Sequence, residues 1–340
     1  MPIDSHPRPV SGPGRSACRA GGATVTVAAW TRSDGDGPHA LFTGGVHGDE
    51  YEAMAALRAL IGELASRTIR GRVTIIPVAN APAFDAACRT GPDGMDLART
   101  FPGKTDGTVT ERIAAELTEH IRSADFYIDL HSGGASYFVY PLVGYTLHPD
   151  ARVLAAQRRM ARAFGLPLIW GTDPRLNGRS LSAARDAGVP AIYAEYLGGG
   201  RLSDAGVRAY MRGCRRVLAE CGLIGDDGER EPDGSLSQGR MVEDAREGSG
   251  HLQTRHTAPI DGFFEPRARL GARLGPGEPL GEIVDALGTH RITIPAAHGG
   301  AVIAIRALPR VARGESVGVV LDEIDGREPL ELPEWPRDPL

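Results

Sequence analysis

The stretch GGVHGDEYE, Gly44–Glu52, decides how this chain can fold, because it joins an apolar run to side chains that can bind a metal. The run before it is HALFT, His39–Thr43, which has the length and composition of a buried strand. Directly after that run, His47 and Glu50 lie three residues apart. The pair alone is weak evidence, because acids are also favoured in the first turn of a helix. Its meaning depends on what the rest of the sequence adds.

Two further runs end in the same way. FYIDL, Phe126–Leu130, runs directly into His131, and AIYA, Ala191–Ala194, runs directly into Glu195. Glycines follow both runs closely. In open α/β sheets, active sites lie at the carboxyl ends of the strands. Three strand ends that carry metal-binding or acid/base side chains therefore predict one shared site.

These side chains fit a catalytic zinc site. Zinc is bound by histidine nitrogens and carboxylate oxygens, and a catalytic zinc keeps three protein ligands plus one open position for water. His47, Glu50 and His131 supply two imidazoles and one carboxylate, so we predict that they bind one Zn²⁺ per chain. Glu195 is then left over as a carboxylate that can act as general base on the metal-activated water.

The first 220 residues alternate between strand-like and helix-like stretches. We expect strands over residues 23–30, 39–43, 73–78, 126–130, 168–170 and 191–196. We expect helices over residues 49–67, 110–121, 151–164, 180–187 and 203–221. Such alternation predicts an α/β fold, with a largely parallel or mixed sheet and helices on both faces.

The composition changes after residue 224, and it divides the chain into five expected segments. They are a mobile leader over 1–22, a catalytic domain over 23–224, a linker over 225–254, an all-β domain over 255–323 and a proline-rich tail over 324–340. The all-β domain is expected because short β-like runs alternate there with glycines. This pattern resembles a barrel-sandwich hybrid, the shape of biotinyl and lipoyl carriers. No lysine follows Lys104, so the domain cannot be such a carrier.

The overall composition argues against several classes of protein. The chain of 340 residues has a net charge of −5 and no basic block, so we expect no nucleic-acid partner. No apolar run reaches the roughly eighteen residues of a transmembrane helix, so we expect no membrane partner. The N-terminus lacks the apolar core of a secretory signal, and the four cysteines show no paired metal spacing. Both observations favour a cytoplasmic protein with reduced thiols. We leave a homo-oligomer open.

The motifs together resemble the succinylglutamate desuccinylase and aspartoacylase family, within the zinc carboxypeptidase-like superfamily. GGVHGDEYE is similar to the family's first metal motif, and DLHSGG, residues 129–134, is similar to its second. AEYLGGG, residues 194–200, resembles the segment with the catalytic glutamate, and residues 80–103 resemble the arginine-bearing substrate loop. The similarity runs in order from about residue 40 to about residue 200, and it is nearest to bacterial N-acyl amino acid and diamine deacylases.

The resemblance implies a fold and roles for further residues. The fold would be a zinc-carboxypeptidase-like mixed sheet flanked by helices, with a smaller C-terminal all-β domain beside the pocket. Arg89 would polarise the scissile carbonyl, and Arg99 would grip a substrate carboxylate. Arg179 and Arg185 lie in the segment before Glu195, which contributes specificity in the family, so both are expected to bind substrate.

One position departs from the family. Where the family has Asn-Arg before the Phe-Pro-Gly turn, this chain has Ala98-Arg99. In the family that asparagine and arginine together grip a substrate carboxylate, and an alanine side chain cannot hydrogen-bond. Either another group, such as Arg179 or Arg185, supplies the contact, or the substrate is different at this point.

Three other residues near the motifs have less certain roles. We expect Asp96 to hold the turn at residues 101–103. Asp129 lies two residues before His131, so strand alternation allows it to support that histidine, and facing away from the metal is the alternative. Tyr193 shares a face of its strand with Glu195, and we expect it to pack in the core.

The favoured function is a zinc-dependent hydrolase that cleaves the amide bond of an N-acyl amino acid or a related small N-acyl amine. The alternatives are a carboxypeptidase-type peptide hydrolase and an inactive metal-binding homologue. Alanine at position 98 argues against strict recognition of a free carboxyl terminus. The presence of both Glu195 and Arg89 argues against an inactive protein. We therefore expect Zn²⁺ as the cofactor and a small N-acyl molecule as the partner.

Overall fold

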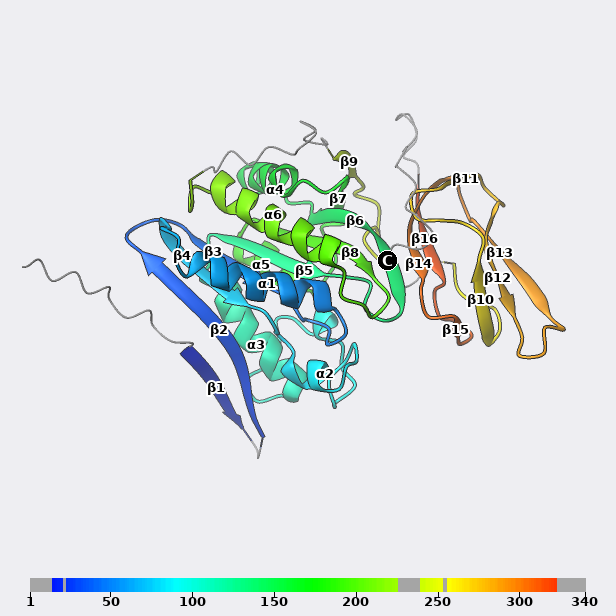
Figure 1. Cartoon of the computed structure of the whole chain (residues 1–340), viewed down its shortest axis with the longest axis horizontal. Coiled ribbons are helices and arrows are strands. Elements are labelled where there is room, and N and C mark those ends of the chain that lie inside the picture. Colours follow the sequence, from blue (N-terminus) through cyan, green and yellow to red (C-terminus); the bar gives the residue numbers. More distant parts are fainter. Residues whose placement is uncertain (1–13, 21–22, 226–238, 253–255, 323–340) are drawn as a thin grey trace, which may run out of the picture.

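The computed structural model describes residues 14–20, 23–225, 239–252 and 256–322 (Figure 1). Its helices are α1 (Tyr51–Leu64), α2 (Ala81–Asp85), the 3₁₀ helix η1 (Leu97–Arg99), α3 (Val109–Arg122), α4 (Ala151–Phe164), α5 (Ser180–Ala187) and α6 (Asp204–Glu220). Its first nine strands are β1 (Gly14–Ala20), β2 (Ala23–Asp34), β3 (His39–Thr43), β4 (Gly71–Ile76), β5 (Phe126–His131), β6 (Tyr137–Thr146), β7 (Leu168–Thr172), β8 (Ala191–Gly198) and β9 (Arg240–Glu243). The C-terminal strands are β10 (Gly262–Pro266), β11 (Arg273–Leu274), β12 (Pro279–Val284), β13 (Arg291–Pro295), β14 (Gly300–Arg306), β15 (Arg310–Val311) and β16 (Gly318–Asp322).

A mixed sheet of twelve strands forms the centre of the molecule. The main path through it runs β1-β2-β4-β3-β5-β8-β6-β14-β11. Strands β4, β3, β5 and β8 pair parallel with one another, whereas β2 pairs antiparallel with β4 and β6 pairs antiparallel with β8. The expected α/β class with a mixed sheet is confirmed. The parallel strands place the carboxyl ends of β3, β5 and β8 at one edge.

Helices cover both faces of this sheet. α1, α4 and α6 pack on one face, and α3 and α5 pack on the other (Figure 1). Strand β3 shows why the sequence folds in this way, since all five of its residues are buried. Phe42 packs into the hydrophobic core that includes α1, α4 and α6, and Leu41 packs into the core that includes α3 and α5. The two side chains separate in this way because successive side chains of a strand point to opposite faces. Burial on both faces explains why the strand has no polar alternation.

The helices begin and end where the sequence can satisfy their terminal backbone groups. α3 follows a capping box in which the Thr108 hydroxyl accepts from the Glu111 backbone and the Glu111 carboxylate accepts from the Thr108 backbone. α4 and α5 end at Gly165 and Gly188, which have φ angles of 81° and 69°. This left-handed conformation is the usual helix stop and favours glycine.

Strand β6 is a central element that we did not predict. Its sequence, YFVYPLVGYT, carries Pro141 in its interior, and proline normally argues against a central strand. The register between β6 and β8 shifts between Val139 and Leu142, around that proline. The irregularity accommodates a residue that cannot donate a ladder hydrogen bond.

The C-terminal part of the chain forms a second sheet but also enters the first. Strands β13, β12, β10 and β15 make a separate four-stranded sheet, in agreement with the expected smaller β domain. Strand β14 instead pairs with β6, so that Ala304 lies opposite Val139, and β16 pairs with β14. Figure 1 shows these C-terminal strands beside the end of the central sheet. The C-terminal part of the chain is thereby built into the central sheet as well.

Two of the expected loose segments contain strands. Gly14–Ala20, within the expected leader, forms β1 and pairs with β2. Arg240–Glu243, within the expected linker, forms β9 and pairs with β7. In both places the chain is part of the central sheet, where we expected a mobile leader and a linker. The rest of the leader up to residue 13 and the proline-rich tail lie outside the described residues, and the division into domains stays a prediction.

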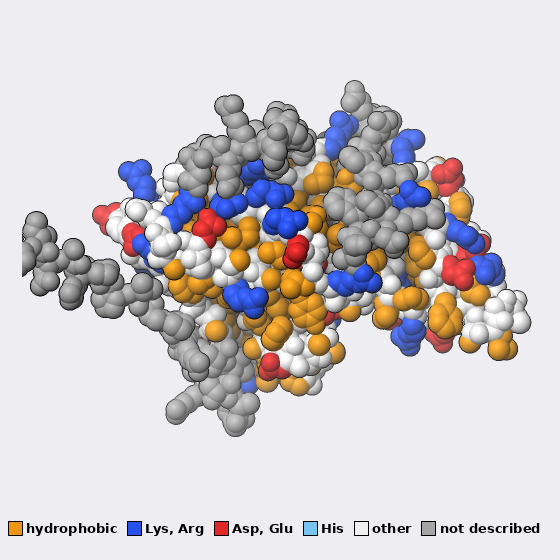
Figure 2. All heavy atoms as spheres, in the orientation of Figure 1, with side chains coloured by type: hydrophobic (Ala, Val, Ile, Leu, Met, Phe, Trp, Pro, Cys, Tyr) orange, Lys and Arg blue, Asp and Glu red, His pale blue; other side chains and the backbone are white. Residues whose placement is uncertain are grey.

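Among the described helices, none is both long and apolar enough to span a bilayer. Apolar side chains gather over α1 and α2 on the face that Figure 2 shows, and Phe84 on α2 is 42% exposed. The homo-oligomer that we left open stays a prediction.

Candidate metal centre and active site

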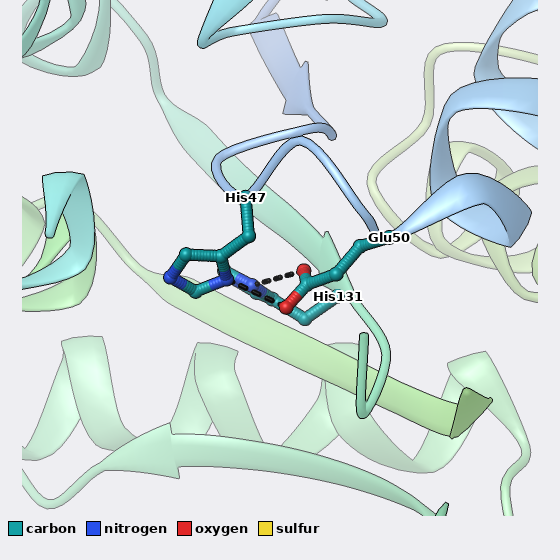
Figure 3. Close-up of side chains that lie close together, drawn as sticks. All are labelled: His47, Glu50 and His131. Carbon is teal, nitrogen blue, oxygen red and sulfur yellow. Dashed lines mark hydrogen bonds and ion pairs between the residues drawn. The ribbon is translucent and has the colours of Figure 1, made fainter. Parts of the chain in front are cut away.

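The three strand ends meet as the sequence predicts. The loop after β3 carries His47 and Glu50, and β5 ends at His131 (Figure 3). Glu195 on β8 lies directly opposite His131 in the parallel register of β5 and β8. α1 begins at Tyr51, later than we expected, because the residues before it form the loop that carries the two side chains.

His47, Glu50 and His131 form a buried cluster with the donor atoms of a metal site. One ligand atom from each residue lies within 4.8 Å of the other two. Glu50 lies between the histidines, with Oε1 2.6 Å from His47 Nδ1 and Oε2 2.9 Å from His131 Nδ1 (Figure 3). The three residues are 3%, 1% and 9% exposed. This is the set of two imidazoles and one carboxylate that catalytic zinc sites use.

Each histidine is also held from its other side by an aspartate. His131 Nε2 lies 3.0 Å from Asp129 Oδ2, and His47 Nε2 lies 3.1 Å from Asp96 Oδ1. Such carboxylates fix the tautomer and the ring orientation of a metal-binding histidine. Both histidines are therefore oriented so that Nδ1 faces Glu50.

The two aspartates have clearer roles in the structure than in the sequence. Asp129 supports His131, which settles the alternative that we left open. Asp96 does hold the following turn, since its carboxylate caps η1 and its carbonyl accepts from the Thr100 hydroxyl. Its carboxylate also bonds the guanidinium of Arg89, at 3.0 and 3.1 Å. Sequence alone does not indicate that Asp96 reaches His47, because the two are far apart along the chain.

Charge shifts the pKa values in this cluster strongly. Burial raises the pKa of Glu50, but the charges of His47 and His131 outweigh burial and hold that pKa well below its usual value. Burial lowers the pKa of His131, but Asp129 and Glu50 outweigh it and raise that pKa well above its usual value. The acids of the cluster thus stabilise a positive charge between them. A divalent cation would supply that charge in place of protons.

Glu195 lies beside the cluster with a different environment. Burial raises its pKa to about 8, and the nearby charges of Glu50 and Asp129 add to this while His131 and Arg89 oppose it. Within the described part of the chain, its buried Oε2 has no hydrogen-bond partner. A buried carboxylate oxygen without a partner is costly and is retained where it has a function.

A pocket opens from this cluster, and its walls contain most of the predicted residues. Its lining comprises His47, Glu50, Arg89, Ala98, Arg99, His131, Ser132, Gly133, Tyr137, Val139, Thr146, Thr172, Arg179, Ser180, Leu181, Tyr193, Glu195, Gly250, Leu252 and Ala304. Arg185 is not in this lining. Its guanidinium instead donates to the carbonyls of Pro174 and Leu176 and to Asn177 Oδ1, and so braces the loop before α5.

Tyr193 lies in this lining, on the side of Glu195, where we had expected core packing alone. Its ring occupies the space above Gly144 on the neighbouring strand, to which it is paired in register. A Cβ atom on Gly144 would come within 2.0 Å of that ring. Glycine at this position therefore lets the tyrosine lie flat enough to form part of the pocket wall.

The C-terminal segment completes the pocket. Ala304 of β14 and Leu252 both line it, next to Tyr137 of β6. The Tyr137 hydroxyl donates to the Ser316 carbonyl at 2.8 Å, so this wall is tied to the C-terminal strands. The family resemblance implies a β domain beside the pocket. Ala304, Leu252 and the carbonyl of Ser316 are the points at which the C-terminal segment contacts this wall.

The chain is similar to a known family of catalytic domains and to a deacetylase. Residues 36–221 match the model of the succinylglutamate desuccinylase/aspartoacylase catalytic domain. An N-alpha-acetyl-L-2,4-diaminobutyric acid deacetylase of Halomonas elongata is 32% identical over 298 residues, which cover 86% of this chain and 84% of that protein.

Two solved structures share the fold over nearly the whole chain. A succinylglutamate desuccinylase/aspartoacylase of Rhodobacter sphaeroides superposes with a TM-score of 0.77 at 30% identity, covering 95% of this chain and 99% of that one. The product-bound ectoine utilization protein EutE (DoeB) of Ruegeria pomeroyi superposes with a TM-score of 0.79 at 28% identity, covering 92% and 96%. By its catalytic-domain match and its relatives, the chain belongs to the succinylglutamate desuccinylase/aspartoacylase family.

Proposed function

We propose that this protein is a zinc-dependent hydrolase that cleaves the amide bond of an N-acyl amino acid. The observation that carries the proposal is the carboxylate of Glu195, which has a buried oxygen without a partner in the described chain and lies beside the cluster of His47, Glu50 and His131. Family membership supports the reaction class, and the Halomonas relative is itself named as a deacetylase of an N-acetyl amino acid.

The donor set fits one Zn²⁺ held by His47, Glu50 and His131. Ligand atoms of the three residues lie within 4.8 Å of one another, and both histidines are oriented by carboxylates on their far side. When bound there, zinc would lower the pKa of a water molecule and polarise the substrate carbonyl.

Glu195 is the group that we assign to proton transfer. As general base it would take a proton from the attacking water, and as general acid it would return that proton to the leaving nitrogen. Its pKa of about 8 is raised by burial, and a cation at the neighbouring cluster would favour the ionised form that a base requires.

Arg89 is the group that we assign to the carbonyl oxygen. Its guanidinium lines the pocket and is held by Asp96. The Arg89 side chain is 35% exposed. A permanently charged fork of donors can follow the negative charge that develops on that oxygen during attack. Asp96 would therefore orient both a metal-binding histidine and the arginine that stabilises the oxyanion.

Arg99 and Arg179 are the groups that we assign to a carboxylate of the substrate. Both line the pocket, and burial together with the charge of Arg99 lowers the pKa of Arg179 to about 10. Among the described residues of the lining, the acids are Glu50 and Glu195, which are assigned to the metal and to proton transfer. Of the two arginines that could replace the missing asparagine at position 98, Arg179 is the one that faces the pocket.

The test is a hydrolysis screen on zinc-loaded protein. The substrates are N-acetyl, N-succinyl and N-formyl amino acids, acylated diamines, and short peptides with free carboxyl termini. We expect release of a free amine from an N-acyl amino acid, lost on chelation and restored by zinc. Release of C-terminal residues from peptides alone would favour a carboxypeptidase. Bound zinc without any amide hydrolysis would favour an inactive homologue.

A further inference from the structure

The carboxylate of Asp129 is the centre of a buried polar network behind the metal cluster. The side chain is fully buried, and its Oδ2 lies 3.0 Å from His131 Nε2. Two hydroxyls donate to it, one from Thr43 to Oδ1 at 2.6 Å and one from Ser180 to Oδ2. The carboxylate group of an aspartate can rotate about its bond to Cβ, and the hydrogen-bond donors around it fix its orientation. The two hydroxyls thus determine how Asp129 presents Oδ2 to His131.

The two hydroxyls come from different parts of the fold. Thr43 is the last residue of β3, in the strand beside β5. Ser180 is the first residue of α5, it lines the pocket, and it is only 5% exposed. Ser180 bonds the same carboxylate oxygen that faces His131. Of these two residues, only Ser180 belongs to the helix whose N-cap residue is an arginine assigned to the substrate carboxylate. Its hydroxyl therefore links that helix to the aspartate behind His131.

That arginine is Arg179, the residue directly before Ser180. Its own polar contacts hold it to α5 and to the 250 loop: the backbone amide donates to Ser182 Oγ at 2.7 Å, and the guanidinium donates to the Gly250 carbonyl at 3.2 Å. Neither contact reaches β5. The hydroxyl of Ser180 does reach it, through Asp129. One peptide bond therefore separates the substrate arginine from the network that orients a metal-binding histidine.

We propose that Ser180 is a positioning residue that orients Asp129 toward His131 and fixes the place of Arg179 relative to the metal centre. The second half of this statement rests on the proposed function, because it concerns a substrate carboxylate. The first half concerns the histidine and the metal alone. Ser180 acts through its neighbours and takes no part in the chemical step.

Ser180→Ala and Thr43→Val form a matched pair of variants, because each removes one hydroxyl from the same carboxylate. We expect each to weaken zinc binding about tenfold, the size of one hydrogen bond to a charged group. Zinc affinity is measured by competition with a chromophoric chelator, without any substrate. Ser180→Thr keeps the hydroxyl and is expected to keep wild-type affinity, which separates loss of the bond from disturbance of α5.

The pair should differ in how the enzyme treats a substrate carboxylate. With an N-acyl amino acid and its α-carboxamide as paired substrates, Ser180→Ala is expected to raise the KM for the acid about five- to tenfold more than for the amide. Thr43→Val is expected to leave the ratio of the two KM values unchanged. Ser180→Thr is expected to restore the wild-type ratio.

Each half of the proposal has its own refutation. Wild-type zinc affinity in Ser180→Ala would show that the hydroxyl does not orient Asp129. An equal change of the KM ratio in both variants would show that the effect does not pass through α5. If no amide substrate is turned over by the wild type, the proposed function fails, and the zinc titration still decides the first half.

Discussion

At the scale of single residues, the site contains two carboxylates with opposite properties. Glu50 is surrounded by imidazoles that hold its pKa well below the usual value, whereas burial raises the pKa of Glu195 to about 8. Carboxylates whose environments separate their pKa values in this way commonly divide two roles. In the proposed function, the division is between a charged group that would bind the metal and a group that can take up and release a proton.

The first prediction concerns that proton. Glu195→Gln should keep the fold and the zinc content, because the amide has nearly the shape of the carboxyl group. It should lower kcat on the order of 10²–10⁴-fold, the contribution typical of general acid/base catalysis. Steady-state kinetics and metal quantification on the same sample provide the measurement. A kcat close to that of the wild type would assign proton transfer to another group.

The second prediction concerns the cost of burying Glu195 in the metal-free protein. Its pKa is about 8 when folded and near 4.5 when exposed, so between these values the folded state keeps a proton that the unfolded state has lost. Stability from this group is therefore full below about pH 4.5 and falls as the pH rises towards 8. Glu195→Gln has no such loss, so its stability relative to the wild type should increase over that window, by an amount on the order of a few kcal/mol.

Denaturant unfolding of both proteins in chelator at pH 5 and pH 8 gives the comparison. The wild type serves as the reference at each pH, so the titration of groups distant from Glu195 cancels. A stability difference that stays constant between the two pH values would mean that Glu195 does not keep its proton in the folded state.

At the scale of elements, the strands that carry the site could be predicted from sequence, whereas the elements that connect its walls could not. β3, β5 and β8 are short, largely buried strands, so their sequences are almost free of polar alternation, and predicted site residues lie at or just after the apolar runs. β6 was missed because Pro141 lies inside it, and β9 because four residues in a polar segment give little signal.

Side-chain direction was the other limit at this scale. Arg179 and Arg185 lie on the same short segment, and the sequence offers no reason to choose between them. The structure separates them, since Arg179 is the N-cap residue of α5 and lines the pocket, whereas Arg185 lies six residues further along and bonds the preceding loop. The contact between Asp96 and His47 was hidden for a similar reason, because it joins two loops that only the folded sheet brings together.

The third prediction concerns η1, where Ala98 lines the pocket next to Arg99. Ala98→Asn adds an amide that can share a substrate carboxylate with that arginine. It should lower the KM for an N-acyl amino acid more than for its carboxamide and leave kcat nearly unchanged, since the contact is made equally in the ground and transition states.

The same change in an Arg99→Gln background is the control, and there the gain should disappear. Kinetics on the paired substrates give the ratio directly. An unchanged preference between acid and amide would mean that the side chain at position 98 does not reach the carboxylate.

At the scale of the whole molecule, the metal cluster joins the loop after β3 to the end of β5 and so bridges neighbouring strands of the central sheet. The fourth prediction follows from this placement. A cation that binds only the folded arrangement stabilises it by mass action, by roughly 2.7 kcal/mol at a free concentration a hundred times its Kd. Zinc should therefore raise the melting temperature of chelator-treated protein.

His131→Ala removes one ligand from that bridge and provides the control. Its melting temperature should no longer respond to zinc, while calcium, which prefers oxygen ligands, should have no effect on either protein. Thermal unfolding of both proteins with and without each ion provides the measurement. An equal response of wild type and variant to zinc would place the stabilising ion elsewhere.

The pairing of β14 with β6 also has a consequence for the order of events during synthesis. Val139 and Ala304 face each other across this pair and both line the pocket, yet almost half of the chain separates them. A ribosome that has released the motifs of the proposed metal site has still to make β14, and until then β6 lacks its partner over residues 137–139, although β7 already pairs with residues 142–146. Contacts between such distant segments also form slowly. The nascent chain would therefore hold its metal ligands well before it has a closed pocket, so catalysis would begin only after nearly all of the protein has emerged.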